Sequence, residues 1–362
     1  MLYLLGIISE KLSFLKSIYL RSFICFTLAF TLVVVLGGPF IEFLHRRKFD
    51  EKIRDDGPSV HQNKKGTPTM GGVLIIAVLF FSNFISANLI NPQILLLFLV
   101  TVAFAVIGFI DDYKKFTESK KGLSGRKKLL GQGIIAIIVW LYVTQHGITG
   151  DGALDLTLIC PINVRWSIYI GGLGMLIFII VILMGSSNAV NITDGLDGLA
   201  IMPMIICCAM LATIAYFSSH MELTQHLKLY YINGAGEITV YLAGVCGAGL
   251  GFLWYNFYPA QVFMGDTGSL TLGGILGVVA ILLKQELILP VVGGIYVLEA
   301  LSVILQVASF KLRGVRIFKM APLHHHFELM GLAETKVTMR FWIASFMFGI
   351  LALGVIRLRG LF

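Results

Sequence analysis

The sequence predicts an all-α, polytopic membrane protein with about ten transmembrane helices and both termini on the extracytoplasmic side. Of its 362 residues, 57% are hydrophobic and only 13% are charged, and the mean hydropathy is +0.86. A soluble domain of this length needs far fewer apolar residues. The apolar residues also gather in runs of about 20, the length that crosses a bilayer as a helix. The basic residues gather in a few of the segments between these runs.

Ten apolar runs define the predicted spans. The first has full spanning length and is not a short apolar region with a cleavage site, so we expect no cleaved leader. No internal repeat or second soluble domain is recognisable, so residues 1–362 are predicted to form a single integral membrane domain. The spans lie at about residues 18–44, 70–90, 93–110, 129–146, 166–185, 199–217, 237–255, 268–284, 287–310 and 341–356.

The distribution of Lys and Arg sets the predicted orientation, because loops that stay in the cytoplasm carry the positive excess. The loops after the first, third and ninth spans hold 20 of the 28 basic residues. Loops after odd-numbered spans should therefore face the cytoplasm. We expect five such loops, at about 45–69, 111–128, 186–198, 256–267 and 311–340, to form the active site.

Two features of the composition exclude other kinds of protein. The net charge of +8 does not indicate nucleic-acid binding, because the basic residues alternate with apolar spans and do not line one face. The five cysteines form no CxxC pair and mostly lie inside apolar runs, where cysteine behaves as a small hydrophobic residue. We therefore predict no nucleic-acid partner and no disulfide.

Two adjacent carboxylates, Asp111 and Asp112, stand where the third predicted span leaves the membrane. Adjacent acids repel each other unless a cation or hydrogen-bond donors compensate. The pair predicts a divalent-metal site, a general base or both. The alternative is a solvated helix end beside Lys114 and Lys115. The DDxxD spacing of isoprenoid synthases is absent, because Lys115 occupies its last position.

The segment 188–198, NAVNITDGLDG, carries a polar residue at every third position. On a helical or 3₁₀ turn such residues lie along one side, and the glycines between them permit close backbone approach. This pattern suits hydrogen bonding to a nucleotide or a sugar. The alternative is a turn that caps the sixth span, with Asp197 as the capping residue.

Asp266 lies between Gly265 and Gly268 at the start of the eighth predicted span, three residues after Phe263. A carboxylate is a hard oxygen ligand for Mg²⁺, and an aromatic ring beside it can stack on a base. The alternative makes Phe263 an interfacial aromatic residue and Asp266 a helix cap.

Three consecutive histidines, 324–326, lie in the last predicted cytoplasmic loop. On a helix their side chains diverge by about 100° per residue and cannot share one ion. On an extended stretch, His324 and His326 share one side and His325 opposes them. A zinc site is one interpretation, but contact with phosphates or a general-acid role suits the surrounding oxygen ligands better.

The remaining signals are weaker. A basic turn, Lys64-Lys65-Gly-Thr-Pro-Thr-Met-Gly-Gly, offers cations and free N–H groups to a diphosphate. Glu299 and Gln306 lie in the ninth span, where polarity is costly, so they should face the bundle interior or a cavity. We expect Gln306 to reach a substrate and Glu299 to have a structural partner.

Together these motifs resemble a known family. From Lys64 to Met330 the chain closely resembles the phospho-N-acetylmuramoyl-pentapeptide transferases, members of the polyprenyl-phosphate N-acetylhexosamine-1-phosphate transferase superfamily. The resemblance rests on the adjacent aspartates, the segments NAVNITDGLDGLA and PAQVFMGDTGSL, and the triple histidine followed by Phe-Glu-Leu. It implies ten transmembrane helices in the bacterial inner membrane, a homodimer and a cytoplasmic-facing active-site cleft.

The resemblance also implies the reaction and its participants. The enzyme would transfer phospho-N-acetylmuramoyl-pentapeptide from its UDP derivative to undecaprenyl phosphate with Mg²⁺, giving lipid I and UMP. Asp111, Asp112 and Asp266 would be the catalytic acids, with Asp266 the main Mg²⁺ ligand. Phe263 would stack on uracil, and the uridine side would also include Asn191, Asp194, Gly195, Leu196, Asp197, Met264, Gln306 and His325. The diphosphate and the lipid phosphate would involve Lys65, Lys121, Asn256, His324 and His326, of which the two histidines are also counted as catalytic.

The residue types independently favour phosphoryl transfer, in which positioning and charge neutralisation do most of the work. We expect Asp111 to orient or deprotonate the prenyl phosphate, which then attacks directly; an alternative route forms a covalent aspartyl phosphate first. The nearest rival is a sister enzyme that transfers N-acetylglucosamine-1-phosphate. A transporter would instead place its ionisable residues near the bilayer midplane, where Glu299 is the main example.

Overall fold

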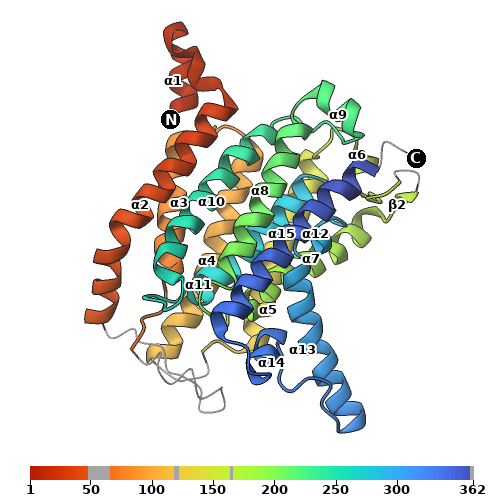
Figure 1. Cartoon of the computed structure of the whole chain (residues 1–362). Coiled ribbons are helices and arrows are strands. Elements are labelled where there is room, and N and C mark those ends of the chain that lie inside the picture. Colours follow the sequence, from red (N-terminus) through yellow and green to blue (C-terminus); the bar gives the residue numbers. More distant parts are fainter. Residues whose placement is uncertain (48–65, 118–121, 164–165, 359–362) are drawn as a thin grey trace.

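The computed structural model describes residues 1–47, 66–117, 122–163 and 166–358. Within these ranges, nine helices are long and apolar enough to cross a membrane, and they pack side by side in one bundle (Figure 1). The nine are α2 (Ile18–Arg46), α4 (Pro92–Thr117), α5 (Gly125–His146), α7 (Gly171–Thr193), α8 (Ile201–Ser218), α10 (Ala235–Asn256), α11 (Gly265–Leu282), α13 (Gly294–Arg313) and α15 (Glu334–Leu358).

Shorter elements connect these helices. A small antiparallel ladder pairs Thr157 with Tyr169 and follows a helical turn. The shorter elements are α1 (Leu2–Ile8), η1 (Glu10–Lys16), α3 (Gly72–Ser86), α6 (Gly152–Asp155), β1 (Thr157–Leu158), β2 (Ile168–Tyr169), α9 (Met221–Leu227), α12 (Leu289–Val292) and α14 (Leu323–Leu329).

The predicted fold class is confirmed, and each of the ten apolar runs contains a helix in the expected order. Two runs differ from expectation. The second forms only α3, whose 15 residues extend about 22 Å and fall short of the bilayer core. The ninth is broken: α12 ends before Gly293, and α13 begins after it. The triple histidine lies within α14 and is therefore helical and not extended.

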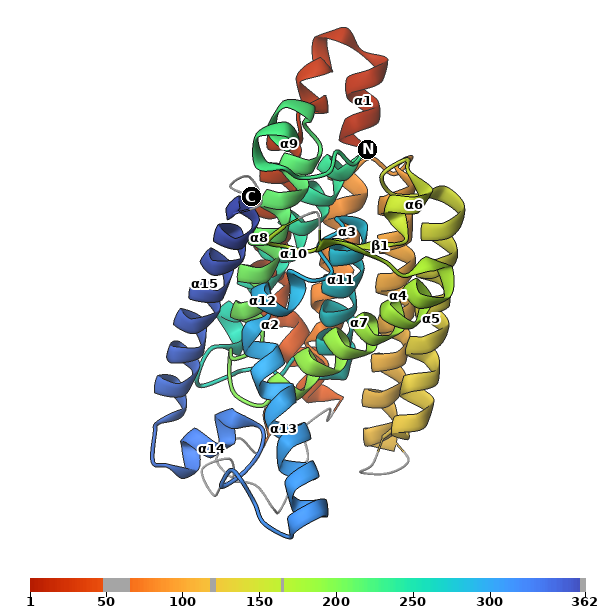
Figure 2. The same cartoon turned by 90° about the vertical axis from the view of Figure 1, so that its right-hand side faces the viewer.

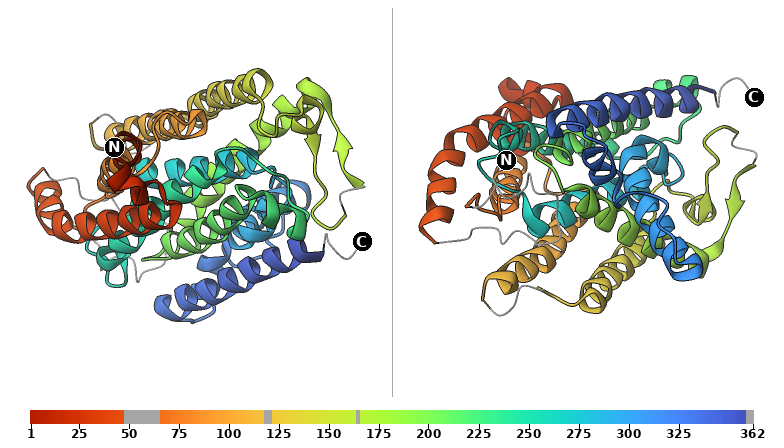
Figure 3. Two further views of the ribbon diagram at one scale, coloured as in Figure 1. Left: turned by 90° about the horizontal axis from the view of Figure 1, so that it is seen from above. Right: turned by 60° about the horizontal axis from the view of Figure 1, so that its bottom comes forward.

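Helix α11 is the central element of the bundle, because every residue after its first is buried. It packs against α4 on one side and α7 on another, and the view along the bundle shows it enclosed by neighbouring helices (Figure 3). Glycines allow the close approach. A Cβ at Gly274 would lie 2.5 Å from the Phe104 ring, and one at Gly273 would lie 2.6 Å from the Ser186 backbone oxygen. This packing holds the ends of α4, α7 and α11 together.

The N-terminus and the last described turn of α15 lie at the same end of the bundle as α6 and α9, whereas α14 lies at the opposite end (Figures 1 and 2). The ends of α4, α5 and α13 that carry basic residues belong to the α14 end. By the positive-inside rule this end is predicted to face the cytoplasm.

Candidate active site

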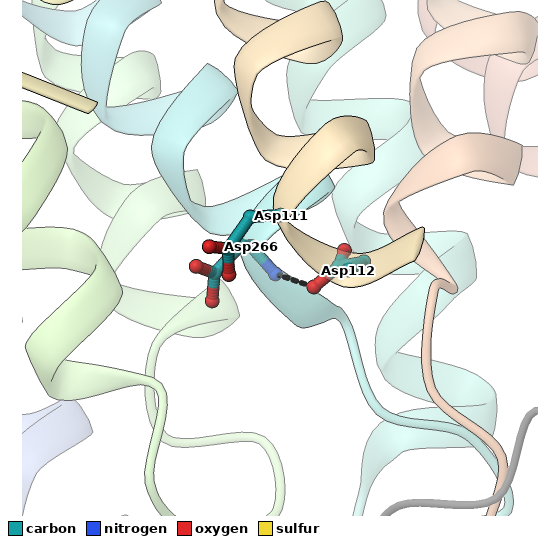
Figure 4. Close-up of side chains that lie close together, drawn as sticks. All are labelled: Asp111, Asp112 and Asp266. Atoms are coloured by element: carbon teal, nitrogen blue, oxygen red, sulfur yellow. Dashed lines mark hydrogen bonds between the residues drawn. The ribbon is translucent and has the colours of Figure 1, made fainter. Parts of the chain in front are cut away.

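Three carboxylates converge at the α14 end of the bundle (Figure 4). Asp111 and Asp112 come from the last turns of α4, and Asp266 comes from the first turn of α11. One oxygen of each lies within 4.8 Å of the others, and the exposed fractions of the three residues are only 0%, 2% and 9%. The structure thus brings together the three acids that were singled out from the sequence. Buried acids this close to one another require compensation by positive charge.

The crossing of α4 and α11 depends on Gly108. A Cβ at this position would lie 2.4 Å from the backbone oxygen of Asp266 and 2.5 Å from Cα of Thr267. No side chain fits without moving one helix away from the other. The glycine therefore sets the distance at which the acids of α4 meet the acid of α11.

Gly108→Ala is expected to lower about 100-fold the rate of the UMP release that the resemblance implies, because a displacement near 1 Å in a catalytic constellation has about that cost. The measurement is UMP release by the purified variant with saturating substrates. Gly354→Ala serves as the matched control, since this glycine lies within α15, outside the loops assigned to the active site, and a Cβ there meets no atom within 4 Å. Normal turnover in Gly108→Ala would contradict the proposed dependence on helix spacing.

Asp112 binds the beginning of α11 with both carboxylate oxygens. Oδ1 accepts a hydrogen bond from the Asp266 amide at 3.0 Å, and Oδ2 accepts from the Thr267 amide at 2.9 Å and the Thr267 hydroxyl at 2.6 Å. A carboxylate at a helix N-terminus satisfies free N–H groups and interacts favourably with the helix dipole. Asp112 thereby caps a helix other than its own and fixes Asp266. The interpretation of Asp266 itself as a cap finds no support, because Asp266 lies inside α11 and the residue at the N-cap position is Met264.

Two lysines neutralise the other two acids. Nζ of Lys128 lies 3.0 Å from Asp111 and 2.6 Å from Asp266, and Nζ of Lys115 lies 2.7 Å and 3.1 Å from the same two carboxylates. The Leu123 amide donates a further bond to Asp111 at 2.7 Å. The acid pair is therefore bridged twice by ammonium groups.

Asn191 joins α7 to this cluster. Its side-chain amide donates to Asp266 at 3.0 Å and to the Ser269 hydroxyl at 2.8 Å. Asn188 donates instead to Gln132 of α5 at 2.8 Å. The polar residues of this segment thus serve different partners, and Asn191 is the one in direct contact with the acids.

The turn after α7 is held from three sides. Asp197 accepts from the Ala260 amide at 2.9 Å, and its own amide donates to Glu334 of α15 at 2.9 Å. Asn256 accepts from the Gly198 amide at 3.1 Å and donates to the Val262 carbonyl at 2.9 Å. Helix α8 has no side-chain cap, so the interpretation of Asp197 as its capping residue is not supported. In this structure both side chains position loops.

The three histidines of α14 have separate partners, as their helical spacing requires. His324 is buried, and both its backbone amide and Nδ1 meet the carboxylate of Glu299, at 3.1 and 2.8 Å. His325 pairs with Glu328 at 2.8 Å, and Nδ1 of His326 accepts from the Lys319 amide at 3.1 Å.

Burial lowers the pKa of His324 and so favours the neutral imidazole. Since Nδ1 faces a carboxylate, it carries the proton and Nε2 is left as an acceptor without a hydrogen-bond partner among the described residues. Nε2 lies against Gly195, where a Cβ would be 2.4 Å away. His324 thus links the α14 segment to the turn after α7.

The other predicted site residues differ in how accessible they are. Leu196 and Met264 are buried, at 4% and 1% exposure, and their carbonyl groups accept hydrogen bonds from the Leu199 and Gly72 amides. Gln306 holds the loop after α13 by donating to the Phe318 carbonyl and accepting from the 317 and 318 amides. Gly195 is exposed, and Phe263 and Asp194 are partly exposed. Lys65 and Lys121 lie outside the described residues.

Lys115, Lys128 and Glu334 contact the site but were not predicted. The lysines were attributed to positive-inside bias, which also explains their presence in a cytoplasmic loop. The spacing of Lys115 could have indicated its role. It lies three and four residues after the paired acids on α4, so it faces them. Glu334 lies far from the motifs in sequence and gave no local signal.

The acid cluster fits a hard divalent cation. Its donors are all carboxylate oxygens, and the adjacent Asn191 and Ser269 add neutral polar groups. Magnesium prefers such oxygen ligands, whereas zinc sites usually contain histidine or cysteine. No described histidine or cysteine belongs to the cluster.

Comparison with known proteins gives consistent matches over the whole chain. The model of glycosyl transferase family 4 matches residues 94–284, and phospho-N-acetylmuramoyl-pentapeptide-transferase signature 1 matches residues 64–76. A phospho-N-acetylmuramoyl-pentapeptide-transferase of Fusobacterium nucleatum subsp. nucleatum is 64% identical over 361 residues, covering 100% of both chains. One of Desulfatibacillum aliphaticivorans is 46% identical over 333 residues, covering 91% of each.

Proposed function

Since the chain belongs to the phospho-N-acetylmuramoyl-pentapeptide transferases of glycosyl transferase family 4, we propose how its acid cluster carries out the transfer. The protein is a multi-pass enzyme of the bacterial inner membrane in peptidoglycan synthesis. The donor is UDP-N-acetylmuramoyl-pentapeptide, the acceptor is undecaprenyl phosphate, and the products are lipid I and UMP. The observation that carries the proposal is the convergence of three buried carboxylates from α4 and α11 at one end of the bundle.

The cofactor in this proposal is Mg²⁺, with Asp266 as its main ligand. When bound there, it would neutralise charge on the diphosphate oxygens and make UMP a better leaving group. Asn191 keeps the Asp266 carboxylate oriented, and Asp112 keeps the backbone of the same residue in place. Neighbouring helices therefore fix the position of the Asp266 carboxylate.

Asp111 is the residue that we assign to the lipid phosphate. It orients this group or removes its proton, and a phosphate oxygen then bonds to the sugar-linked phosphorus of the donor. The bond from that phosphorus to the bridging diphosphate oxygen breaks, and its electron pair leaves with UMP. The alternative covalent route would first place the phosphoryl group on an aspartate. A phosphorylated aspartate trapped without prenyl phosphate would overturn the direct route.

We place the uridine near the turn after α7, where Asp194 and Gly195 are accessible beside Phe263. The ring of Phe263 would stack on uracil, and the buried Leu196 and Met264 would hold the chain beside it in place. Asp197 and Gln306 would act through the loops that they hold. His324, His326 and Lys65 are assigned to the diphosphate side.

Within one chain, the five predicted cytoplasmic loops together would form the active site, including the segments around Lys65 and Lys121.

We also propose that the enzyme works as a homodimer in the lipid bilayer. Light scattering of the detergent-solubilised protein measures the oligomeric state. A mass equal to one chain plus detergent would contradict the dimer.

Comparison of two donors tests the substrate assignment. Purified protein in detergent receives undecaprenyl phosphate, Mg²⁺ and either UDP-N-acetylmuramoyl-pentapeptide or UDP-N-acetylglucosamine, and UMP release is measured. We expect turnover with the muramoyl donor only. Turnover with the N-acetylglucosamine donor only would keep the chemistry and overturn the substrate.

A further inference from the structure

Every carboxylate oxygen of the acid cluster already accepts a hydrogen bond or lies in an ion pair with a lysine. The two oxygens of Asp112 take donors from α11. Those of Asp111 meet Leu123 and Lys128 on one side and Lys115 on the other. Those of Asp266 meet Asn191 and Lys115, and Lys128. A divalent cation therefore reaches Asp266 or Asp111 only where a cationic donor moves away.

The lysines are the donors that can move. The donors to Asp112 belong to the backbone and first turn of a buried helix, so their displacement would unwind α11. The ammonium groups instead stand on long flexible stems whose exposed fractions are 18% for Lys128 and 37% for Lys115. They also repel a second cation strongly at distances of about 3 Å.

The charge balance adds a second constraint. Three carboxylates and two ammonium groups leave the cluster with one net negative charge, so a divalent cation arriving alone would make it positive. An anion that arrives with the cation removes this excess. A displaced ammonium group then has a natural partner, because lysine binds phosphate oxygens as a point charge.

From this geometry we propose that Lys115 and Lys128 are resident counter-cations that the metal displaces, so that the divalent cation and the donor diphosphate bind cooperatively. In the free enzyme the lysines keep three buried acids together. On loading, they turn from the carboxylates toward the diphosphate. The inference rests on the proposed metal role of Asp266. By linkage, the diphosphate raises metal affinity by the same factor as the metal raises diphosphate affinity.

Binding of Mn²⁺, followed by electron paramagnetic resonance at constant pH, tests this inference. The purified full-length protein is titrated with and without UDP, which supplies the nucleoside diphosphate. A titration of UDP without protein is the blank, because UDP itself binds Mn²⁺, and Asp266→Asn protein is titrated in the same way. We expect UDP to tighten Mn²⁺ binding by the wild type about tenfold or more, the factor that corresponds to one close charge interaction partly screened by solvent.

Lys128→Met should bind Mn²⁺ without UDP about tenfold more tightly than the wild type and gain less from UDP. Lys127→Met is the matched control, since this neighbouring lysine is exposed, and it should behave as the wild type. Lys115→Met gives a second variant at a more exposed position, and it should change in the same direction. Gel filtration and thermal unfolding in EDTA identify variants that fail to fold.

Each outcome separates the two claims. Unchanged or weaker Mn²⁺ binding in folded Lys128→Met and Lys115→Met would overturn the exchange and leave the metal assignment intact. An equal affinity of the wild type with and without UDP would do the same. If Asp266→Asn binds Mn²⁺ as the wild type does, the metal assignment fails and the exchange fails with it.

Discussion

Asp266→Asn is expected to lower UMP release by about 10³-fold or more while leaving the protein folded and inserted. The substitution removes the carboxylate that we assign as the main metal ligand, in a site where charge on oxygen must be neutralised. The remaining Asp111 keeps both lysines as partners, so no buried acid loses its compensation. The measurement is UMP release at saturating substrate and Mg²⁺, with thermal unfolding as the check on folding.

Glu222→Gln is the matched control for this carboxylate-to-amide change. Glu222 is exposed on α9, at the end of the bundle opposite the acid cluster, so its variant should retain full activity. Turnover near the wild-type rate in Asp266→Asn would refute the metal role of this residue. Loss of folding in that variant would refute the claim that its role is catalytic and not structural.

Asp112→Asn is expected to combine two losses. An amide offers one acceptor oxygen where the carboxylate accepts three hydrogen bonds, and its NH₂ group would face the N–H donors of α11. A buried donor left without an acceptor costs about 1–3 kcal/mol, so the melting temperature should fall. The freed start of α11 should also displace Asp266 and reduce turnover about 100-fold.

The contrast between the two variants tests the assigned roles. Asp266→Asn should lose activity at nearly constant stability, whereas Asp112→Asn should lose both. Both are measured by UMP release and thermal unfolding in the same detergent. If Asp112→Asn keeps wild-type stability and loses activity as completely as Asp266→Asn, Asp112 is a ligand or base and not a positioning residue.

Most of the fold could be predicted, because a bilayer demands long apolar helices and these leave a clear pattern in the sequence. The breaks were harder to foresee. The ninth run is continuous in hydrophobicity, yet it divides at Gly293, and α3 stops at Ser86 although its apolar run extends further. Contacts between helices lie next to both points, from the Asn88 amide to Glu237 of α10 and from Gly294 to Phe348 of α15, and hydrophobicity alone does not record such contacts.

The site was predicted unevenly for a similar reason. The acids stood out because paired or glycine-flanked aspartates at span ends are costly, and the structure brings all three together. What each acid does with its oxygens depends on the crossing of α4 and α11, so the capping role of Asp112 was not predictable from sequence. Glu299 was expected to have a structural partner, and it binds His324. The roles of the individual substrate-binding residues remain proposals.

The most direct test of the central claim is the position of the metal itself. Crystals of the wild-type protein grown with Mn²⁺ and UDP allow the ion to be located by anomalous scattering at the manganese edge. The account predicts a peak about 2.1 Å from an Asp266 carboxylate oxygen, as expected for a small divalent cation, with the Lys128 ammonium group withdrawn from that oxygen. A peak away from Asp111, Asp112 and Asp266, or none at the cluster, would contradict it.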